Sequence, residues 1–253
     1  VSAYPQSTTV GMVKSYVDVK GASANALAHY CGAHMVVVDM GINADMSDVP
    51  GLLHRKIAFG TKDITEGAAM SRAEAIHAIE AGIEIAENKI KEGYRVFTVG
   101  EMGIANTTAS ACILGAFNRW NAVEVTGRGT NISDARLLHK IEMVQKALDV
   151  NQPDPADGLD VLSKVGGFEF GCMTGVMLGA AANHCLTIID GFNSTASAFI
   201  AKALSEESVQ YLMASHLSLE QAHRKSLKVI GLTEYIDLDI RLGEAVGASI
   251  KKK

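Results

Sequence analysis

The sequence lacks the signals that mark several common classes of protein. Its cysteines show no C-x-x-C spacing and stand in apolar surroundings, at Cys31, Cys112, Cys172 and Cys185. This pattern favours reduced core thiols in a cytoplasmic protein over disulfides, a zinc site or a redox role. The 23 Lys and Arg residues and 28 Asp and Glu residues give a net charge of -5 and form no basic stripe. We therefore expect neither nucleic acid nor an anionic membrane surface as a partner.

An uninterrupted apolar run of bilayer length is also missing. The most apolar stretch, GCMTGVMLGAAANHCLTII at 171–189, contains Asn183 and His184. It therefore predicts a buried helix followed by a buried strand, and no membrane span. No internal repeat or low-complexity segment is present, and the polar link NQPDPADG at 151–158 is too short to indicate two independent domains.

What the chain does contain is an alternation of short apolar runs and helical patterns. This alternation predicts a mostly parallel sheet covered by helices, an α/β fold. We expect strands at 35–42, 94–100 and 185–191. Between the first two, Ser71 and Glu74 form a capping box before a helix that Gly93 closes, so we expect a βαβ unit. Further helices are expected at 107–117, 134–149, 159–182 and 194–204, and from Ser218 with Gln221 at the capping-box position.

The stretch GEMGIANTT at 100–108 follows a predicted strand and opens a predicted helix. Asn106 is a good helix N-cap, and two glycines permit a tight turn. The free amides of such a helix start, at the carboxyl end of a parallel strand, can bind an anion, although a simple turn explains the residues equally well. The third glycine of a dinucleotide fingerprint and the Gly-Lys-Ser/Thr of a P-loop are both absent.

Each of three other polar residues can be interpreted as having a structural role or a functional one. Lys140 suits a phosphate but is more often a solvated helix residue, and Ser218 is more often only a helix cap. Glu244 lies between Gly243 and Gly247 in an apolar stretch, where a carboxylate requires either a partner such as Arg241 or a chemical role. With eight histidines in the chain, His34 and His216 are interpreted as structural.

Taken together, seven stretches in order resemble one family, the nicotinate-nucleotide:dimethylbenzimidazole phosphoribosyltransferases of cobalamin lower-ligand synthesis. They are VSAYP (1–5), VVDMGI (37–42), GEMGIANTT (100–108), NQPDPADGLDVLSKVGGFEF (151–170), DGFNSTASA (190–198), SHLSLEQAHR (215–224) and RLGEAVGA (241–248). The resemblance covers nearly the whole chain.

The resemblance implies a doubly wound α/β domain with a smaller helical subdomain from the chain ends, usually in a homodimer. It implies a reaction without cofactor or metal. Nicotinate mononucleotide gives its ribose 5-phosphate to an aromatic base, which leaves an α-ribotide and free nicotinate. Residues 1–253 would then be a single phosphoribosyltransferase domain that lacks the family's N-terminal segment and C-terminal helix.

The resemblance also implies roles for particular residues. The general base falls on Glu244 and a second site carboxylate on Glu101. Contacts to the nucleotide and its phosphate fall on Gly103, Asn106, Thr107, Gly129, Lys140 and Ser218. The base pocket falls on Tyr4, Met12, Met102 and Leu242.

Departures from the family pattern leave the acceptor open. Ala245 and Val246 replace a common Gly and Ser or Thr, and Ala105 replaces a common Gly. One alternative is therefore a paralogue that activates phenol or p-cresol as part of a heterodimer. Another is a non-catalytic nucleotide-binding subunit, although the presence of Glu101, Lys140, Ser218 and Glu244 argues against it.

Overall fold

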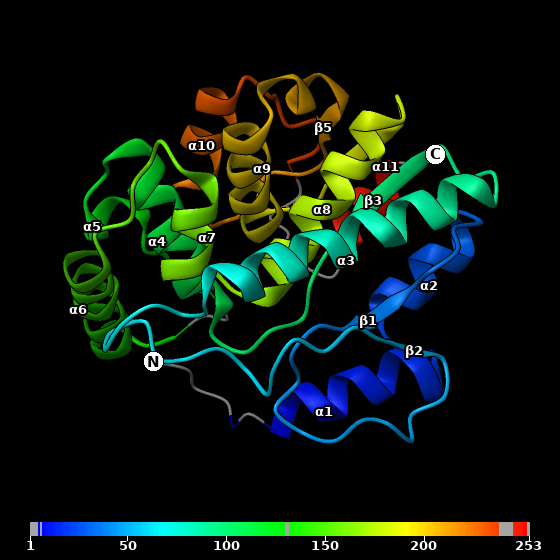
Figure 1. Cartoon of the computed structure of the whole chain (residues 1–253), viewed down its shortest axis with the longest axis horizontal. Coiled ribbons are helices and arrows are strands. Elements are labelled where there is room, and N and C mark those ends of the chain that lie inside the picture. Colours follow the sequence, from blue (N-terminus) through cyan, green and yellow to red (C-terminus); the bar gives the residue numbers. More distant parts are fainter. Residues whose placement is uncertain (1–4, 6, 130–131, 238–244, 252–253) are drawn as a thin grey trace.

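The structure is a computed structural model that describes residues 5, 7–129, 132–237 and 245–251. Its central sheet has three parallel strands in the order β3 (Val96–Val99), β4 (Leu186–Ile189) and β5 (Leu212–Ala214). A second parallel sheet joins β1 (Val37–Asp39) to β2 (Leu52–His54), below the main body in Figure 1. The expectation of an α/β fold with parallel sheets and flanking helices is confirmed.

Helices surround both sheets. Those of the first half are α1 (Ser7–Lys14), a π-helix (Ser15–Val19), α2 (Ser23–Tyr30), α3 (Arg72–Lys91), α4 (Asn106–Asn118) and α5 (Ala122–Val125). Those of the second half are α6 (Asp134–Asn151), α7 (Gly158–Val165), α8 (Phe168–Ala182), α9 (Phe192–Leu204), a 3-10 helix (Glu206–Tyr211), α10 (His223–Ile230) and α11 (Val246–Lys251). None of the helices in the described part of the chain is long and apolar enough to cross a membrane.

Helices α3 and α8 pack closely along one another, as Figure 1 shows. Helix α3 begins at the predicted capping box, in which Ser71 accepts from the Glu74 N–H and the Glu74 carboxylate accepts from the Ser71 N–H. A Cβ at Gly82 would lie 2.1 Å from the Cys172 oxygen, and a Cβ at Gly175 would lie 2.0 Å from the Ile79 oxygen. Only glycine allows the two backbones to approach so closely.

The three predicted strands are confirmed, but their grouping is not. β1 and β3 belong to different sheets, so the segment from 35 to 100 is not a βαβ unit. Strands β2 and β5 were not predicted, because each has three residues and too little alternation to distinguish it from a loop. β5 nevertheless completes the central sheet on the side of β4.

Two predicted helices are wrong in their limits. The helix expected at 159–182 is two helices, α7 and α8, separated by Gly166 and Gly167. No helix begins at Ser218; helix α10 starts five residues later, at His223. Gln221 does not close a capping box there; its side-chain amide donates to the carbonyl oxygen of Thr126 at 3.0 Å.

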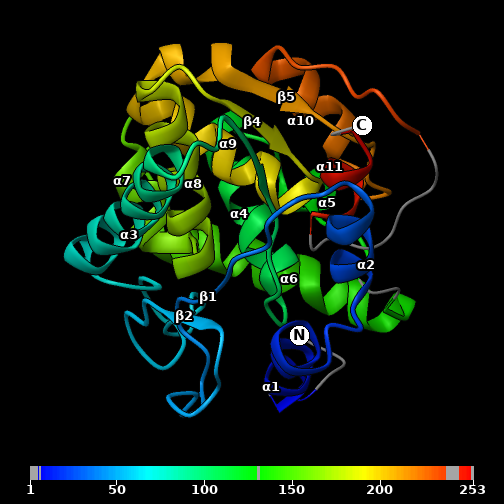
Figure 2. The same cartoon turned by 90° about the vertical axis from the view of Figure 1, so that its right-hand side faces the viewer.

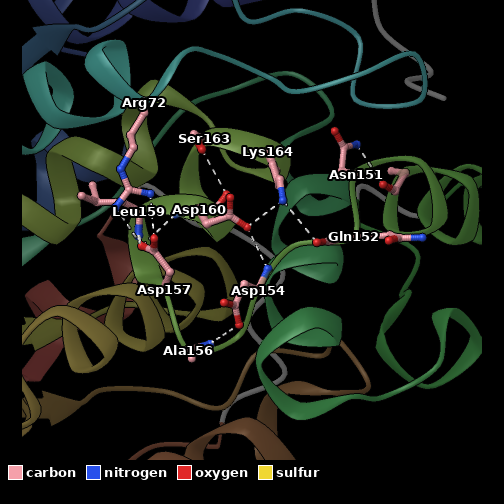
Figure 3. A network of polar contacts seen from close by, with 11 residues as sticks. Arg72, Asn151, Gln152, Asp154, Ala156, Asp157, Leu159, Asp160, Ser163 and Lys164 are labelled. Carbon is pink, nitrogen blue, oxygen red and sulfur yellow. Dashed lines mark hydrogen bonds and ion pairs between the residues drawn. The ribbon is translucent and has the colours of Figure 1, made fainter.

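The polar link at 151–158 is fastened to the helices around it (Figure 3). Asp157 caps α7 by accepting from the Leu159 and Asp160 N–H groups, and it also pairs with Arg72 at 2.7 Å. Lys164 pairs with Asp160 at 2.9 Å. The link therefore joins α6 to α7 within one body.

The C-terminal helix lies against a helix from the first part of the chain. Helix α11 packs against α2, and Figure 2 shows the two side by side. Helix α11 also contacts β3. Consequently, the segment that contains Ala245 lies beside the central sheet.

Candidate active site

The carboxyl ends of three neighbouring parallel strands bring polar residues to one edge of the sheet. Glu101 follows β3, Asp190 follows β4, and Ser215 and His216 follow β5. Parallel strands present these ends on the same side, which is where open α/β sheets bind ligands.

Glu101 is the centre of an amide network. The Asn193 side-chain nitrogen donates to Glu101 Oε1 at 2.7 Å and to Asn106 Oδ1 at 3.0 Å, and the Asn106 side-chain nitrogen donates to Glu101 Oε2. Asn106 is therefore not the predicted N-cap of α4. That position is Ala105, in the left-handed region at φ 69°. Two amides hold the Glu101 carboxylate in a fixed orientation.

Glu169, at the start of α8, was missed by the sequence analysis. Burial raises the pKa of its carboxyl to about 7, with the neighbouring charge of Glu101 as a further cause. A Cβ at Gly103 would lie 3.3 Å from Glu169 Oε1, so the glycine turn packs directly against this acid. The available signal was a carboxylate between two phenylalanines, two residues after Gly-Gly, in the run GGFEF.

A large cavity of about 980 Å³ opens beside these acids. Glu101, Met102, Gly103, Asn106 and Glu169 all line it, and so does Ala245. Its other walls include residues of β1, β3, α6, α8, the N-terminal helices and the segment at 59–65. The volume is at the upper end of the range for small-molecule sites.

The second predicted group of residues lies around Lys140 on α6. Lys140 is 3% exposed, so it is not a solvated helix residue. Its Nζ donates to Thr107 Oγ1 at 2.9 Å and to the Gly127 oxygen at 3.0 Å. Burial lowers the pKa of its ammonium, and the charge of Glu220 partly opposes that shift.

A carboxylate already sits in the glycine-rich turn beside Lys140. Glu220 Oε1 accepts from the Gly129 N–H at 2.7 Å, and Gly129 has φ 53°. A Cβ at Gly127 would lie 2.1 Å from Glu220 Oε2. This turn can therefore bind an anionic group through its backbone.

Ser218 connects Glu220 to the sheet edge. Its N–H donates to His223 Nδ1 at 2.8 Å, and its Oγ accepts from the Glu220 N–H at 3.3 Å. Burial lowers the pKa of His223 to about 3, so this imidazole stays neutral. Ser218 caps a turn, and it does not start a helix.

The predicted residues thus fall into two groups joined at the start of α4. Asn106 belongs to the Glu101 group, and the next residue, Thr107, belongs to the Lys140 group. Thr107, Gly129, Lys140 and Ser218 are not among the described residues that line the cavity. Met12 packs in one apolar cluster with Met102, which does line it. Glu244, Tyr4 and Leu242 lie outside the described residues.

The two histidines interpreted as structural differ in their surroundings. His34 lies beside Tyr94, with ring centroids 5.8 Å apart. His216 is 2% exposed, and its Nδ1 lies 3.6 Å from Asp190 Oδ1.

Within residues 5, 7–129, 132–237 and 245–251, no three His, Cys, Asp or Glu side chains are grouped to hold a metal ion.

Comparisons with known proteins show the family to which the chain belongs. A family model described as Phosphoribosyltransferase matches residues 1–252. Over 250 residues the chain is 47% identical to the nicotinate-nucleotide–dimethylbenzimidazole phosphoribosyltransferase of Geobacter metallireducens, a match that covers 99% of this chain and 70% of that protein. The chain belongs to this phosphoribosyltransferase family.

Other members of the phosphoribosyltransferase family give the same result. The protein of the same name from Chloroflexus aggregans is 47% identical over 248 residues, or 98% of this chain and 70% of that protein. The crystal structure of CobT from Thermus thermophilus superimposes with a TM-score of 0.95 at 37% identity, over 100% of this chain and 75% of that chain. The resemblance inferred from the seven motifs is confirmed.

Proposed function

We propose that this chain transfers ribose 5-phosphate from nicotinate mononucleotide to 5,6-dimethylbenzimidazole or a similar base, in the synthesis of the cobalamin nucleotide loop. The observation that carries the proposal is the start of α4, where consecutive side chains reach two different sites. Asn106 holds Glu101 at the cavity, and Thr107 holds the buried Lys140. A molecule with a phosphate at one end and a reacting carbon at the other fits this arrangement.

In this proposal the phosphate binds at the Lys140 group. Lys140 supplies a positive charge, Ser218 a hydroxyl, and Gly129 a backbone N–H that Glu220 occupies in this structure. The phosphate would displace the Glu220 carboxylate from that N–H. The amides of Gly103 and the first turn of α4 add the positive end of the helix dipole.

The ribose then lies toward the cavity, with C1′ near Glu101. When nicotinate leaves, its positively charged ring nitrogen takes the electron pair of the bond to C1′ and becomes neutral. The departure therefore needs little acid assistance. A negative carboxylate beside C1′ stabilises the positive charge that develops on the sugar. One benzimidazole nitrogen forms the new bond to C1′, on the face opposite the departing nicotinate, which converts a β-nucleotide into an α-ribotide.

The remaining step is removal of the proton on the other benzimidazole nitrogen. We assign it to Glu244, whose place in the motif RLGEAVGA matches the general base of the family. A carboxylate in a pocket without water accepts such a proton efficiently. Met102 and Met12, together with Tyr4 and Leu242, would supply the apolar walls for the base.

The test is a product assay. Protein, nicotinate mononucleotide and dimethylbenzimidazole are incubated, and nicotinate and α-ribotide are quantified by chromatography. We expect both in equal amounts. If neither forms with dimethylbenzimidazole, other benzimidazoles, purines or phenol, the proposal fails. Release with phenol alone would instead support the phenol-activating alternative.

Replacing the proposed base separates binding from turnover. For Glu244→Gln we expect nicotinate mononucleotide affinity within about twofold of wild type and a fall in kcat of about 100-fold or more, the range of general base catalysis. Calorimetry and the product assay measure the two quantities. Unchanged turnover would remove Glu244 from the mechanism.

A further inference from the structure

The ring of His223 joins the turn that carries Ser218 to helix α9. His223 is the first residue of α10 and is 0% exposed, and α9 and α10 lie side by side (Figure 1). Its Nδ1 accepts from the Ser218 N–H at 2.8 Å, and its Nε2 lies 3.0 Å from Thr195 Oγ1 on α9. The ring therefore connects the segment after β5 to the helix that follows β4.

The hydrogen-bond partners of this ring determine which of its nitrogens carries the proton. A backbone N–H can only donate, so the Nδ1 that accepts from the Ser218 N–H is unprotonated. Thr195 has one hydroxyl proton, which it donates to the Gly191 oxygen at 2.9 Å, so its Oγ1 accepts from the Nε2–H of His223. Both contacts indicate a neutral imidazole with its proton on Nε2.

The orientation of the ring is fixed by its contacts. The rings of Phe192 and His216 pack against it, each with its centroid 6.4 Å from that of His223. Half a turn of the imidazole about its Cβ–Cγ bond would put carbon atoms where the two nitrogens lie. The Ser218 N–H would then lose its acceptor, at a cost in free energy.

His223 also closes the turn that carries Ser218 and Glu220. Its backbone N–H donates to the Glu220 oxygen at 2.9 Å, while its ring accepts from the Ser218 N–H. Ser218 Oγ accepts from the Glu220 N–H at 3.3 Å, which uses an acceptor position and leaves the hydroxyl proton able to bond to a ligand oxygen. Glu220 Oε1 in turn reaches the Gly129 N–H, and a Cβ at Gly129 would lie 3.7 Å from Lys140 Nζ. The turn thus joins Ser218 to the surroundings of Lys140.

We propose that His223, with its proton on Nε2, is a positioning residue that holds the Ser218 hydroxyl in place for the phosphate of the nucleotide. Both ring nitrogens are engaged by protein groups, so His223 acts through the Ser218 backbone and not on substrate. This inference rests on the proposed function, in which Ser218 binds that phosphate. A hydrogen bond to a charged group changes affinity roughly 10- to 100-fold, which sets the size of the expected effect.

The first test observes the ring directly in the wild-type protein. Nitrogen-15 NMR separates a protonated from an unprotonated imidazole nitrogen by chemical shift, and His223→Asn identifies the signals of His223 among those of the eight histidines. At neutral pH we expect one tautomer, with Nε2 protonated and Nδ1 unprotonated. The reverse tautomer, a doubly protonated ring or an average of two tautomers would overturn the proposal.

The second test keeps one ring nitrogen at a time. In His223→Asn the side-chain oxygen stands as many bonds from the backbone as Nδ1, so it can still accept from the Ser218 N–H. In His223→Gln the side-chain nitrogen stands as many bonds away as Nε2, which keeps a donor for Thr195 and loses the acceptor. By calorimetry we expect His223→Asn to bind nicotinate mononucleotide within about threefold of wild type and His223→Gln to bind it at least about tenfold more weakly. Inorganic phosphate should give the same order.

The matched control is a histidine at the opposite edge of the sheet. His184 precedes β4, and its Nδ1 contacts the Tyr211 hydroxyl at 2.6 Å, so His184→Gln should bind the nucleotide as wild type does. Equal affinities of His223→Asn and His223→Gln, or tighter binding by His223→Gln, would overturn the role of Nδ1. If one of these two variants does not fold, the other variant and the NMR spectrum of wild type still decide the matter.

The outcomes separate this inference from the proposed function. If nucleotide and phosphate bind in the expected order but wild type makes no product with any acceptor, only the proposed function fails. If product forms but His223→Asn and His223→Gln bind the nucleotide equally well, only the role of His223 fails. If wild type binds neither nicotinate mononucleotide nor phosphate, both fail.

Discussion

Two groups of acids in this molecule have opposite surroundings. The link acids, Asp157 and Asp160, lie at the start of α7 and pair with Arg72 and Lys164 (Figure 3). The hydrogen bond from Arg72 is the main cause that holds the pKa of Asp157 below its usual value. The inner acids, Glu169 and Asp190, have pKa values raised to about 7, chiefly by burial.

The difference lies in what compensates each negative charge. Among the described residues, no lysine or arginine forms an ion pair with either inner acid. They accept hydrogen bonds from backbone and amide groups instead, and Glu101 adds a further negative charge nearby. The ion pairs of the link compensate the charges of its acids, whereas burial holds the pKa values of the inner acids near neutral pH, at a cost in stability.

The largest expected effect comes from neutralising an inner acid. Because Glu169 binds its proton more tightly when folded, ionisation destabilises the fold as pH rises from about 4.3, the unfolded value, to about 7. Relative to wild type, Glu169→Gln should therefore gain stability from about pH 4 to about pH 8, by up to about 3 kcal/mol. Urea unfolding at several pH values measures this gain, and a constant difference between the two proteins would contradict it.

The next effect concerns the two lysines. Lys140→Met keeps an apolar stem but loses the charge and the bonds to Thr107 and Gly127, so nicotinate mononucleotide should bind about 30-fold more weakly, or about 2 kcal/mol. Lys164→Met is the control from the link and should bind as wild type does. Calorimetry measures the Kd of each variant for nicotinate mononucleotide. Equal affinities for both variants would show that the phosphate does not bind at Lys140.

A smaller effect is expected at the glycine turn. A side chain at Gly103 would meet Asn106 Nδ2 at 2.8 Å and Glu169 Oε1 at 3.3 Å, which displaces the amide that holds Glu101. We expect Gly103→Val to weaken nucleotide binding about tenfold, or about 1.4 kcal/mol. Gly67→Val is a suitable control, since a Cβ at Gly67 has nothing within 4 Å. Unchanged affinity in Gly103→Val would mean that the turn only connects β3 to α4.

The smallest effect tests the link acids. Asp157→Ala removes the N-cap of α7 and should cost about 1 kcal/mol of stability at about pH 7. Because the pKa of Asp157 is lowered in the fold, its contribution is present above the unfolded value and disappears as pH falls below it, the opposite trend to Glu169. Thermal unfolding at about pH 7 and about pH 2.5 tests this, and a larger loss at the lower pH would be the wrong sign.

Much of the fold followed from local patterns in the sequence. The apolar runs before Gly100 and Gly191 mark β3 and β4, and the capping box of Ser71 and Glu74 marks the start of α3. Strand pairing could not be read in the same way, because the partner of β1 is the three-residue strand β2 and not β3. Such pairing depends on contacts between distant residues, which periodicity does not encode.

The sequence indicated which residues belong to the candidate site better than it indicated how they are buried and which of them contact one another. The family resemblance pointed to Glu101 and Lys140, but a lone lysine in a helix gives no sign that it is buried. Glu169 and Asp190 lay within recognised motifs and were passed over, since their raised pKa values arise from burial that only the folded chain creates. The assigned roles of all site residues stay predictions.

The most direct test of the contrast between inner and link acids is a carbon-13 NMR titration of the side-chain carboxyls, with Glu169→Gln, Asp190→Asn and Asp157→Ala to assign the signals. We predict that Glu169 and Asp190 titrate with pKa values of about 7 and that the pKa of Asp157 lies below its usual range. Added nicotinate mononucleotide should shift the midpoint of Glu169, which lines the cavity, and leave Asp157 unchanged. Midpoints of about 4 for both inner acids, the ordinary range for carboxyls, insensitive to the nucleotide, would contradict a site built around poised carboxylates.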